Sequence, residues 1–210
     1  MKEKSFKILK SKIIIGLFVV FFLVSFAVTG CMYSRDQVEE KGTKAESLII
    51  HSQKLIELLR DKKIEEFSKY IHPTKGIRFS PYAYIDVDKD LIFQTQEIVE
   101  LWKGSEKYTW GAYDGSGFPI ELTLQEYYEQ FIYDVDFVNP QMIGNNTVIG
   151  KGTTVNNIAE AYPDGVFIEY HFDHIDPQYA GIDWRSLRLV FEKIEDAYYV
   201  VGIVHDQWTI

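Results

Sequence analysis

The chain has 210 residues, of which 46% are hydrophobic and 15% aromatic, a composition typical of a globular domain with a substantial core. Its formal net charge is −9, and no cluster of Lys and Arg follows residue 12. We therefore expect no nucleic-acid partner, because phosphate binding needs a basic stripe. Cys31 is the only cysteine, so the sequence excludes an intrachain disulfide and predicts no cysteine-ligated metal or other cofactor.

The first 30 residues have the layout of an export signal. Five Lys residues among residues 1–12 precede an apolar run over residues 13–28. This run is shorter than the roughly 20 apolar residues that a membrane-spanning helix needs. We predict a cleaved signal peptide over residues 1–30; an ordinary signal with an incidental cysteine and an uncleaved helical anchor are the alternatives.

Val28-Thr29-Gly30-Cys31 resembles the lipobox of bacterial lipoproteins. The resemblance implies cleavage between Gly30 and Cys31, with diacylglycerol and a fatty acyl chain such as palmitate on Cys31. That lipid would hold the protein on the extracytoplasmic face of the cell membrane. Residues 31–43 are polar and lack hydrophobic periodicity, which predicts a lipidated flexible tether.

Residues 44–210 are predicted to form a single α+β domain that starts with two helices. The first helix has one apolar stripe, made of Leu48, Ile49, Leu55, Leu58 and Leu59. Asp61 is placed to cap a second helix, which His72-Pro73 ends because the residue before proline disfavours the α conformation. Its inward side is formed by Ile64, Phe67, Ile71 and Tyr70.

The middle of the chain alternates short strands and helices. We predict strands over residues 76–80 and 108–113, the latter ending in the turn at residues 114–117, and a short helix over residues 95–102. Thr123 and Glu126 have the spacing of a capping box, which predicts a further helix through residue 131.

The last third of the chain is rich in aromatic and β-branched residues, which predicts three strands over residues 166–172, 184–194 and 198–208. A turn at Glu195-Asp196 joins the last two. In the terminal strand, alternation places Val201, Ile203 and His205 on one face and Val200, Val204 and Asp206 on the other. Both faces are apolar at mid-strand. This indicates a central strand, with helices covering one face and another segment covering the second.

This order of elements is similar to that of the nuclear-transport-factor-2-like superfamily. Residues 72–82 and 176–188 also look like segments of a group of uncharacterised bacterial lipoproteins. The resemblance implies a cone-shaped fold in which N-terminal helices pack on a curved antiparallel sheet. The superfamily includes isomerases, dehydratases, cyclases and non-catalytic binding domains, so the fold alone selects no activity.

Two patterns suggest metal sites at first sight. His171 and His174 are three residues apart on a predicted strand, so their side chains point to opposite faces and cannot share an ion. Asp86, Asp88, Asp90 and Glu97 copy the carboxylate spacing of a calcium loop, but a leucine stands where that loop requires glycine. We predict a solvated acidic turn there and no metal site, with a weak calcium site as the alternative.

The candidate site is a set of polar residues that flank or interrupt apolar segments. Equal counts on the two arms of the terminal hairpin place Arg185 opposite Asp206, next to Arg188 and His205. Trp110, Trp184 and Trp208 occur in the same pattern. The full candidate set is Arg185, Arg188, His205, Asp206, Asp183, His72 and Arg78. Such a cluster is either a structural ion-pair network or a pocket in which Arg binds an anionic ligand.

We therefore expect a membrane-anchored extracytoplasmic lipoprotein that binds an unknown small molecule or envelope protein. One alternative is a small-molecule enzyme of isomerase or dehydratase type, with His205 or Asp206 as base and Arg185 or Arg188 stabilising negative charge. Another is a scaffold that docks an envelope protein through exposed sheet. The catalytic residues are unknown from the sequence, since no Ser-His-Asp order, phosphate loop or redox motif supports a named reaction.

Overall fold

The computed structural model describes residues 47–209, and the part from Leu48 onward forms one compact unit. The predicted signal peptide, the lipidation site Cys31 and the tether over residues 31–43 lie outside the described residues. Within residues 47–209, no helix is both long and apolar enough to cross a membrane.

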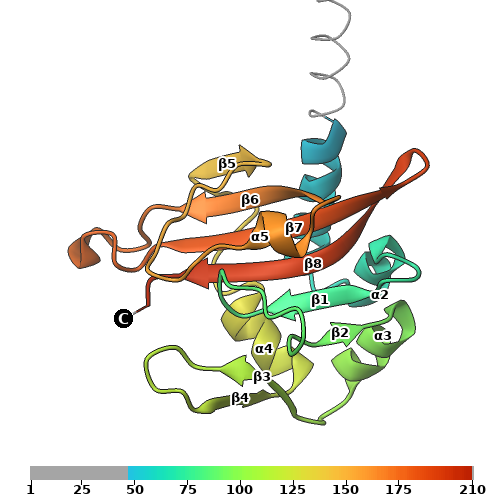
Figure 1. The fold of residues 1–210 in the computed structure, drawn as a ribbon, viewed down its shortest axis with the longest axis horizontal. Coiled ribbons are helices and arrows are strands. Elements are labelled where there is room, and N and C mark those ends of the chain that lie inside the picture. Colours follow the sequence, from blue (N-terminus) through green and yellow to red (C-terminus); the bar gives the residue numbers. More distant parts are fainter. Residues whose placement is uncertain (1–46, 210) are drawn as a thin grey trace, which may run out of the picture. The chain divides into compact units, whose positions relative to one another are not determined.

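A six-stranded sheet organises the described residues (Figure 1). Its strands, in spatial order, are β2 (Ile92–Phe93), β1 (Ile77–Ser80), β8 (Ala197–Gln207), β7 (Arg185–Ile194), β6 (Val166–Phe172) and β5 (Met142–Asn145). As predicted, β8 is a central strand. The architecture is α+β, with an open sheet and a few helices.

The prediction of an entirely antiparallel sheet is wrong, because β1 runs parallel to β8 while the other neighbours are antiparallel. Arg78 lies beside Gly202 in this parallel pair. The two strands are more than a hundred residues apart, so no tight turn fixes their relative direction as one fixes a hairpin. The sequence pattern therefore identifies both strands without determining how they pair.

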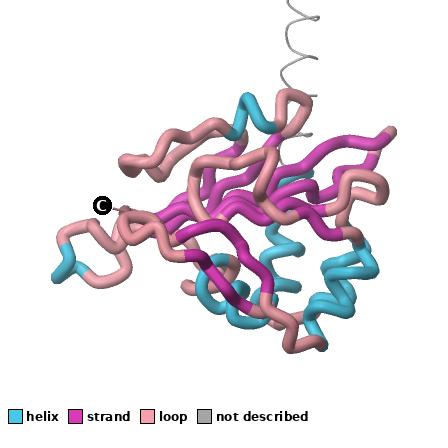
Figure 2. Tube along the Cα trace, turned by 60° about the horizontal axis from the view of Figure 1, so that its bottom comes forward, coloured by secondary structure: helices cyan, strands magenta, loops and turns pink. Residues whose placement is uncertain are grey.

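One face of the sheet carries most of the helices, as Figure 2 shows. Residues 47–60 are helical, followed by α2 (Ile64–Phe67), a 3₁₀ turn (Ser68–Tyr70), α3 (Thr95–Lys103) and α4 (Leu124–Phe131). A separate hairpin of β3 (Tyr108–Ala112) and β4 (Pro119–Leu122) lies in sequence between α3 and α4. The main core joins helix residues such as Leu55 and Phe67 to sheet residues such as Leu187.

Two capping predictions had different outcomes. The capping box is confirmed: the Glu126 amide donates to Thr123 Oγ1 at 3.1 Å, and the Thr123 amide donates to Glu126 Oε2 at 2.8 Å. Asp61 caps no helix, because α2 begins after Lys63 and the Asp61 carboxylate instead binds Arg60 at 2.8 Å. The predicted second helix is therefore one α turn followed by a 3₁₀ turn, although Ile64, Phe67 and Ile71 are buried as expected.

The second face of the sheet is covered by the connection between β5 and β6, residues 146–165, which we call the strap. It contains α5 (Ile158–Ala161), which lies in front of β7 and β8 in Figure 1. Ile158 from the strap packs with sheet residues in a small second cluster that includes Phe167, Val190 and Val204. The expectation that another segment covers this second face is thus confirmed.

The β7–β8 hairpin contains a bulge that changes the faces of its residues. The turn joins Ile194 to Ala197 as predicted, and the pairing stays regular up to Phe191 and Val200. Val190 then pairs with Gly202, so Val201 is an extra residue on β8. Beyond this bulge every partner is displaced by one position. Val201 consequently packs in the second cluster, on the face opposite to the one predicted.

Candidate functional site

The seven predicted site residues do not form one cluster. Because of the bulge, Arg185 lies opposite Gln207, and Asp206 lies opposite Ser186. The predicted pairing of Arg185 with Asp206 is therefore wrong, since adjacent positions on a strand point to opposite faces. Arg185 and His205 are on the helical face, whereas Arg188 and Asp206 are on the face beneath the strap.

On the helical face, Arg185 and His205 share a partner that the sequence did not reveal. Asp134, just after α4, accepts from Arg185 Nε at 2.7 Å and lies 3.4 Å from His205 Nε2. Burial raises the pKa of Asp134, but the neighbouring His205 and Arg185 outweigh it and lower that pKa below its ordinary value. His205 has no exposed surface and meets Phe131 edge-on at 5.6 Å. These side chains therefore bind one another, with His205 buried and Arg185 partly exposed.

On the second face, Arg188 is fully buried between two carboxylates. Arg188 Nε donates to Glu169 Oε2 at 3.0 Å, and Nη1 donates to Asp206 Oδ2 at 3.0 Å. Burial raises the pKa of Glu169, but Arg188 outweighs it and the pKa is lowered; for Asp206 burial dominates and the pKa is raised. Ser186 donates to Glu169 Oε1 at 2.6 Å and lies 2.7 Å from His171 Nδ1. We call these five residues the buried charge cluster.

The buried charge cluster holds the beginning of the strap. The amides of Ile149 and Gly150 donate to Glu169 at 3.0 and 2.8 Å, and Arg188 Nη2 donates to the Gly150 carbonyl at 3.2 Å. Gly150 lies so close to the sheet that a Cβ there would overlap Ser186 Oγ and the Trp184 ring. Buried charged groups thus position a loop rather than a ligand. The only sign of Glu169 in the sequence was its position as an acidic residue inside the otherwise largely apolar segment of β6.

Farther along, the strap is fixed by two hydrogen bonds of the Asn157 side chain and by a contact of Tyr162 with the sheet. Asn157 accepts from the Ile85 amide at 2.8 Å and donates to its carbonyl at 3.0 Å, which satisfies both ends of the Asn157 side chain. The Tyr162 hydroxyl lies against Gly202 of β8, where a Cβ would overlap it.

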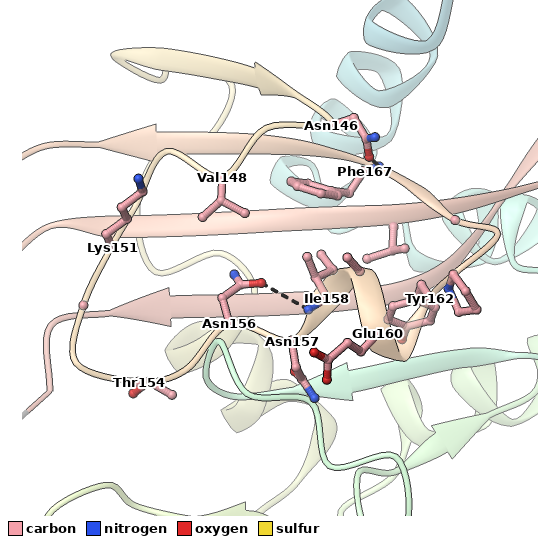
Figure 3. Close-up of a pocket in the computed structure, with 15 residues that line it drawn as sticks. Asn146, Val148, Lys151, Thr154, Asn156, Asn157, Ile158, Glu160, Tyr162 and Phe167 are labelled. Atoms are coloured by element: carbon pink, nitrogen blue, oxygen red, sulfur yellow. Dashed lines mark hydrogen bonds between the residues drawn. The ribbon is translucent and has the colours of Figure 1, made fainter.

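A cleft of about 690 Å³ is lined by residues of the strap together with Phe167 and Val190 of the sheet (Figure 3). This volume is in the usual range for small-molecule sites, about 300–1,000 Å³. Its lining combines apolar residues with amide, hydroxyl and charged side chains: Val148, Ile158, Phe167 and Val190 on the one hand, and Asn146, Lys151, Thr154, Asn156, Asn157, Glu160 and Tyr162 on the other. Sequence reasoning missed the cleft, because the strap has neither periodicity nor a motif.

Two residues of the cleft lining carry a buried polar atom that makes no hydrogen bond of normal geometry, Asn156 Nδ2 and Tyr162 Oη; the Tyr162 hydroxyl faces Gly202 of β8 and lies near the Arg78 guanidinium. Asn156 uses its other end, Oδ1, to accept from the Ile158 amide at 3.1 Å, the contact drawn in Figure 3. Burial raises the pKa of Tyr162 to about 12, so the hydroxyl stays protonated and can donate. Leaving a buried polar group unpaired costs about 1–3 kcal/mol.

The remaining predicted residues have local structural contacts. His72 Nδ1 accepts from the amides of Thr74 and Lys75 at 3.3 and 3.1 Å, which shapes the turn before β1. Arg78 Nη1 donates to the carbonyls of residues 86, 87 and 90. Asp183 accepts from the amides of residues 175 and 176. The backbone amide of residue 176 is the main reason that the Asp183 pKa is lowered.

The three tryptophans also separate. Trp110 is buried in the main core, where it stacks on Tyr127 at 4.1 Å and donates to the Leu122 carbonyl at 2.8 Å. Trp184 lies beneath the strap, 5.9 Å from the His171 ring. Trp208 is 43% exposed. They therefore do not line a common pocket.

Neither suspected metal pattern brings its ligands together. His171 is buried in the charge cluster, whereas His174 lies beyond β6 and is partly exposed. In the acidic turn Asp86 binds Lys89 at 3.0 Å, and Asp90 accepts from Ser80 at 2.5 Å. Glu97 accepts from the Gln94 amide at 2.6 Å, at the start of α3. Over residues 47–209, no three His, Cys, Asp or Glu side chains converge in a metal-binding arrangement.

Comparison of the chain with protein-family models, with curated proteins and with solved structures finds no match.

Proposed function

We propose that this chain is an extracytoplasmic lipoprotein, held on the cell membrane by lipid on Cys31, whose domain binds a small molecule in the cleft beneath the strap. The lipobox-like sequence before Cys31 supports the anchor. The cleft supports the binding role. The acidic net charge of −9 argues against a nucleic-acid partner.

The observation that carries the binding role is the open cleft beneath the strap, whose lining combines apolar, amide and charged side chains. The sequence had placed the ligand site at Arg185, Arg188, His205 and Asp206. The Arg188 and His205 side chains have no exposed surface and Asp206 is 2% exposed, so a ligand has no route to them. Acid–base catalysis by His205 or Asp206 would meet the same obstacle. The cleft at the strap is open and large enough for a ligand.

For the fold we propose the nuclear-transport-factor-2-like arrangement. Its support is the order of the elements, in which helices precede β1 and a long hairpin closes the sheet, and the placement of most helices on one face. The parallel β1–β8 pair departs from the antiparallel sheet that the resemblance implied. This proposal concerns shape alone and adds no activity.

Fatty-acid labelling tests the anchor. Cys31→Ser removes the thiol that would carry the diacylglyceryl group, and we expect the variant to lose all label from a fatty-acid analogue fed to cells. Two acyl chains give stable anchoring that one chain does not, so the unlabelled variant should be found either as an uncleaved precursor or as a domain released from the membrane. Unchanged labelling of the Ser variant would refute lipidation at this position.

Co-purification tests the binding role. The full chain, purified in detergent, is denatured and the released small molecules are identified by mass spectrometry. Ala159 is exposed and lines the cleft, so Ala159→Trp should fill it. Ala112 is also exposed but lies on the β3–β4 hairpin, so Ala112→Trp is the matched control. We expect a compound retained by the parent and by Ala112→Trp and absent from Ala159→Trp. Equal recovery from all three would contradict a ligand in this cleft.

A further inference from the structure

His51, in the helix over residues 47–60, has one ring nitrogen that is closed off from water. Its Nε2 atom is buried and has no hydrogen-bond partner among the described residues. The rings of Tyr70 and Phe191 meet the imidazole edge-on, at centroid distances of 5.5 and 5.8 Å. A protonated imidazole carries an N–H on both nitrogens, so protonation would bury a charged donor that has no acceptor. The site therefore suits the neutral ring alone.

The described side chains that face His51 provide no negative charge. Lys54, one turn along the same helix, is itself a cation and donates to the Tyr70 hydroxyl at 2.5 Å. Burial is the main reason that the pKa of His51 is lowered below its ordinary value of 6.5; Lys54 lowers it further, and the Tyr198 backbone raises it. Lysine and tyrosine side chains keep their charge between pH 5 and pH 7. Among these groups, only His51 changes its charge over that range.

The first half of this helix has few other attachments. Leu48 is buried, and the Ser52 hydroxyl bonds to that of Tyr170 at 2.8 Å. By contrast, four of residues 55–59 are buried in the main core. Local openings in a folded protein start where buried contacts are few. A loss of favourable packing at His51 would therefore act on residues 47–54 and leave residues 55–60 in place.

We propose that His51 makes the attachment of residues 47–54 acid-sensitive: protonation of the imidazole releases this segment from Tyr70 and Phe191, while the rest of the helix stays packed. The released segment takes up the proton at the ordinary pKa of 6.5, whereas the packed segment resists it. The packed form is therefore unaffected above that pH and becomes less favourable as the pH falls below it. Residues 47–54 come soon after the predicted tether, so their release lengthens the link to the proposed lipid anchor. This device is independent of any ligand in the cleft and goes beyond the proposed binding role.

Hydrogen exchange measures the release. The full chain in detergent is compared with His51→Phe at pH 7 and at pH 5; phenylalanine keeps a ring between Tyr70 and Phe191 but cannot take up a proton. At each pH, the exchange rate of the amides of residues 52–54 in the parent is divided by that in the variant, which cancels the intrinsic effect of pH and the titration of groups elsewhere. We expect this ratio to rise several-fold from pH 7 to pH 5, up to a ceiling of roughly thirtyfold set by the ordinary pKa of 6.5. His174 is partly exposed and lies beyond β6, so His174→Phe is the matched control and should behave as the parent does.

Two measurements can overturn the proposal. A ratio that stays constant between pH 7 and pH 5, or one that rises equally for the amides of residues 55–60, would contradict local release through His51. An NMR titration of the full chain labelled with ¹³C-histidine tests the same point in the parent protein. We expect one of the five histidine signals, the one absent from His51→Gln, to titrate with a midpoint below 6.5. A midpoint at or above 6.5 would show that the packed segment accepts the proton, and would reject the proposal.

Discussion

At the residue scale, the most consequential side chain is Arg188, which alone separates two buried carboxylates. Arg188→Ala would leave Glu169 and Asp206 buried without a cationic partner, and breaking a buried pair in this way typically costs about 3–5 kcal/mol. We expect the free energy of unfolding to fall by that amount in chemical denaturation. Arg185 is partly exposed, so Arg185→Ala should cost less.

The same residues test the register of the hairpin. Arg188 and Asp206 are bonded, so a double-mutant cycle on them should give a coupling energy of about 0.5–3 kcal/mol. Arg185 and Asp206 point to opposite faces, and their cycle should give a coupling near zero. A strong coupling between Arg185 and Asp206 would restore the regular pairing that the sequence suggested and rule out the bulge at Val201.

Asp90 gives the domain a specific pH dependence. Burial raises the pKa of Asp90 to about 6, so the folded protein holds this proton more tightly than the unfolded chain, in which Asp titrates near 3.8. Its favourable contribution is therefore complete below about pH 4 and is lost as the pH rises through 6.

Asp90→Asn measures that contribution. The amide oxygen of Asn can still accept from Ser80 and from the Asp86 amide, but the side chain cannot ionise. We expect the stability of Asp90→Asn relative to the parent to increase by about 1–2 kcal/mol between pH 4 and pH 7, after allowing for partial exposure. Urea denaturation at several pH values measures the difference. A difference that stays constant with pH would disprove the raised pKa.

At the element scale, the strap depends on Gly150. A Cβ at this position would overlap Ser186 Oγ and the Trp184 ring, so Gly150→Ala should destabilise the domain by about 1–3 kcal/mol through overpacking. The amides of Ile149 and Gly150 should also exchange hydrogen faster, because their bonds to Glu169 are disturbed. At Gly104 a Cβ has only ordinary contacts, so Gly104→Ala is the control and should change stability by less than about 0.5 kcal/mol. Unchanged exchange in Gly150→Ala would show that the strap is held elsewhere.

The elements recovered from the sequence are the ones with long or explicit patterns. The helical stripe from Leu48 to Leu59, the capping box at Thr123 and the hairpin turn at Glu195 each have a local physical cause within a few residues. Strands β2, β4 and β5 and helix α5 have two to four residues each, too few for a period to be visible.

The candidate site was predicted less well, and one residue explains much of the difference. Val201 is β-branched like Val200, so its own side chain does not mark it as the bulge residue that changes which β7 residues face His205 and Asp206. Gly202 beside it was the one sequence signal, because a glycine inside a strand can mark a bulge. Asp134 follows α4 in a loop and meets its partners only through the tertiary fold. The cleft depends on how a strap without periodicity crosses the sheet, which no local pattern encodes.

At the scale of the whole molecule, we expect the described domain to need no metal for folding. The carboxylates of the acidic turn are occupied by Lys89, Ser80 and backbone amides, and the two histidines of β6 and its end lie apart. Thermal unfolding of the full chain should therefore give the same midpoint with a chelator and with added calcium. A midpoint several degrees higher in calcium would mean that residues 86–90 form a site after all.

The position of β8 in the sheet has a consequence for how the chain can assemble. This strand comes after every other described strand in the sequence, yet it lies between β1 and β7 and supplies core residues such as Val200 and Ile203 to both halves. During synthesis from the N-terminus, the helices could form early. The central strand of the sheet on which they pack would be missing until residues 197–207 were made. Contacts between such distant segments are slow to form because a long loop must close first. Folding would therefore await the synthesis of residues 197–207, and a chain that lacks them would lose the strand that joins β1 to β7 together with its core residues.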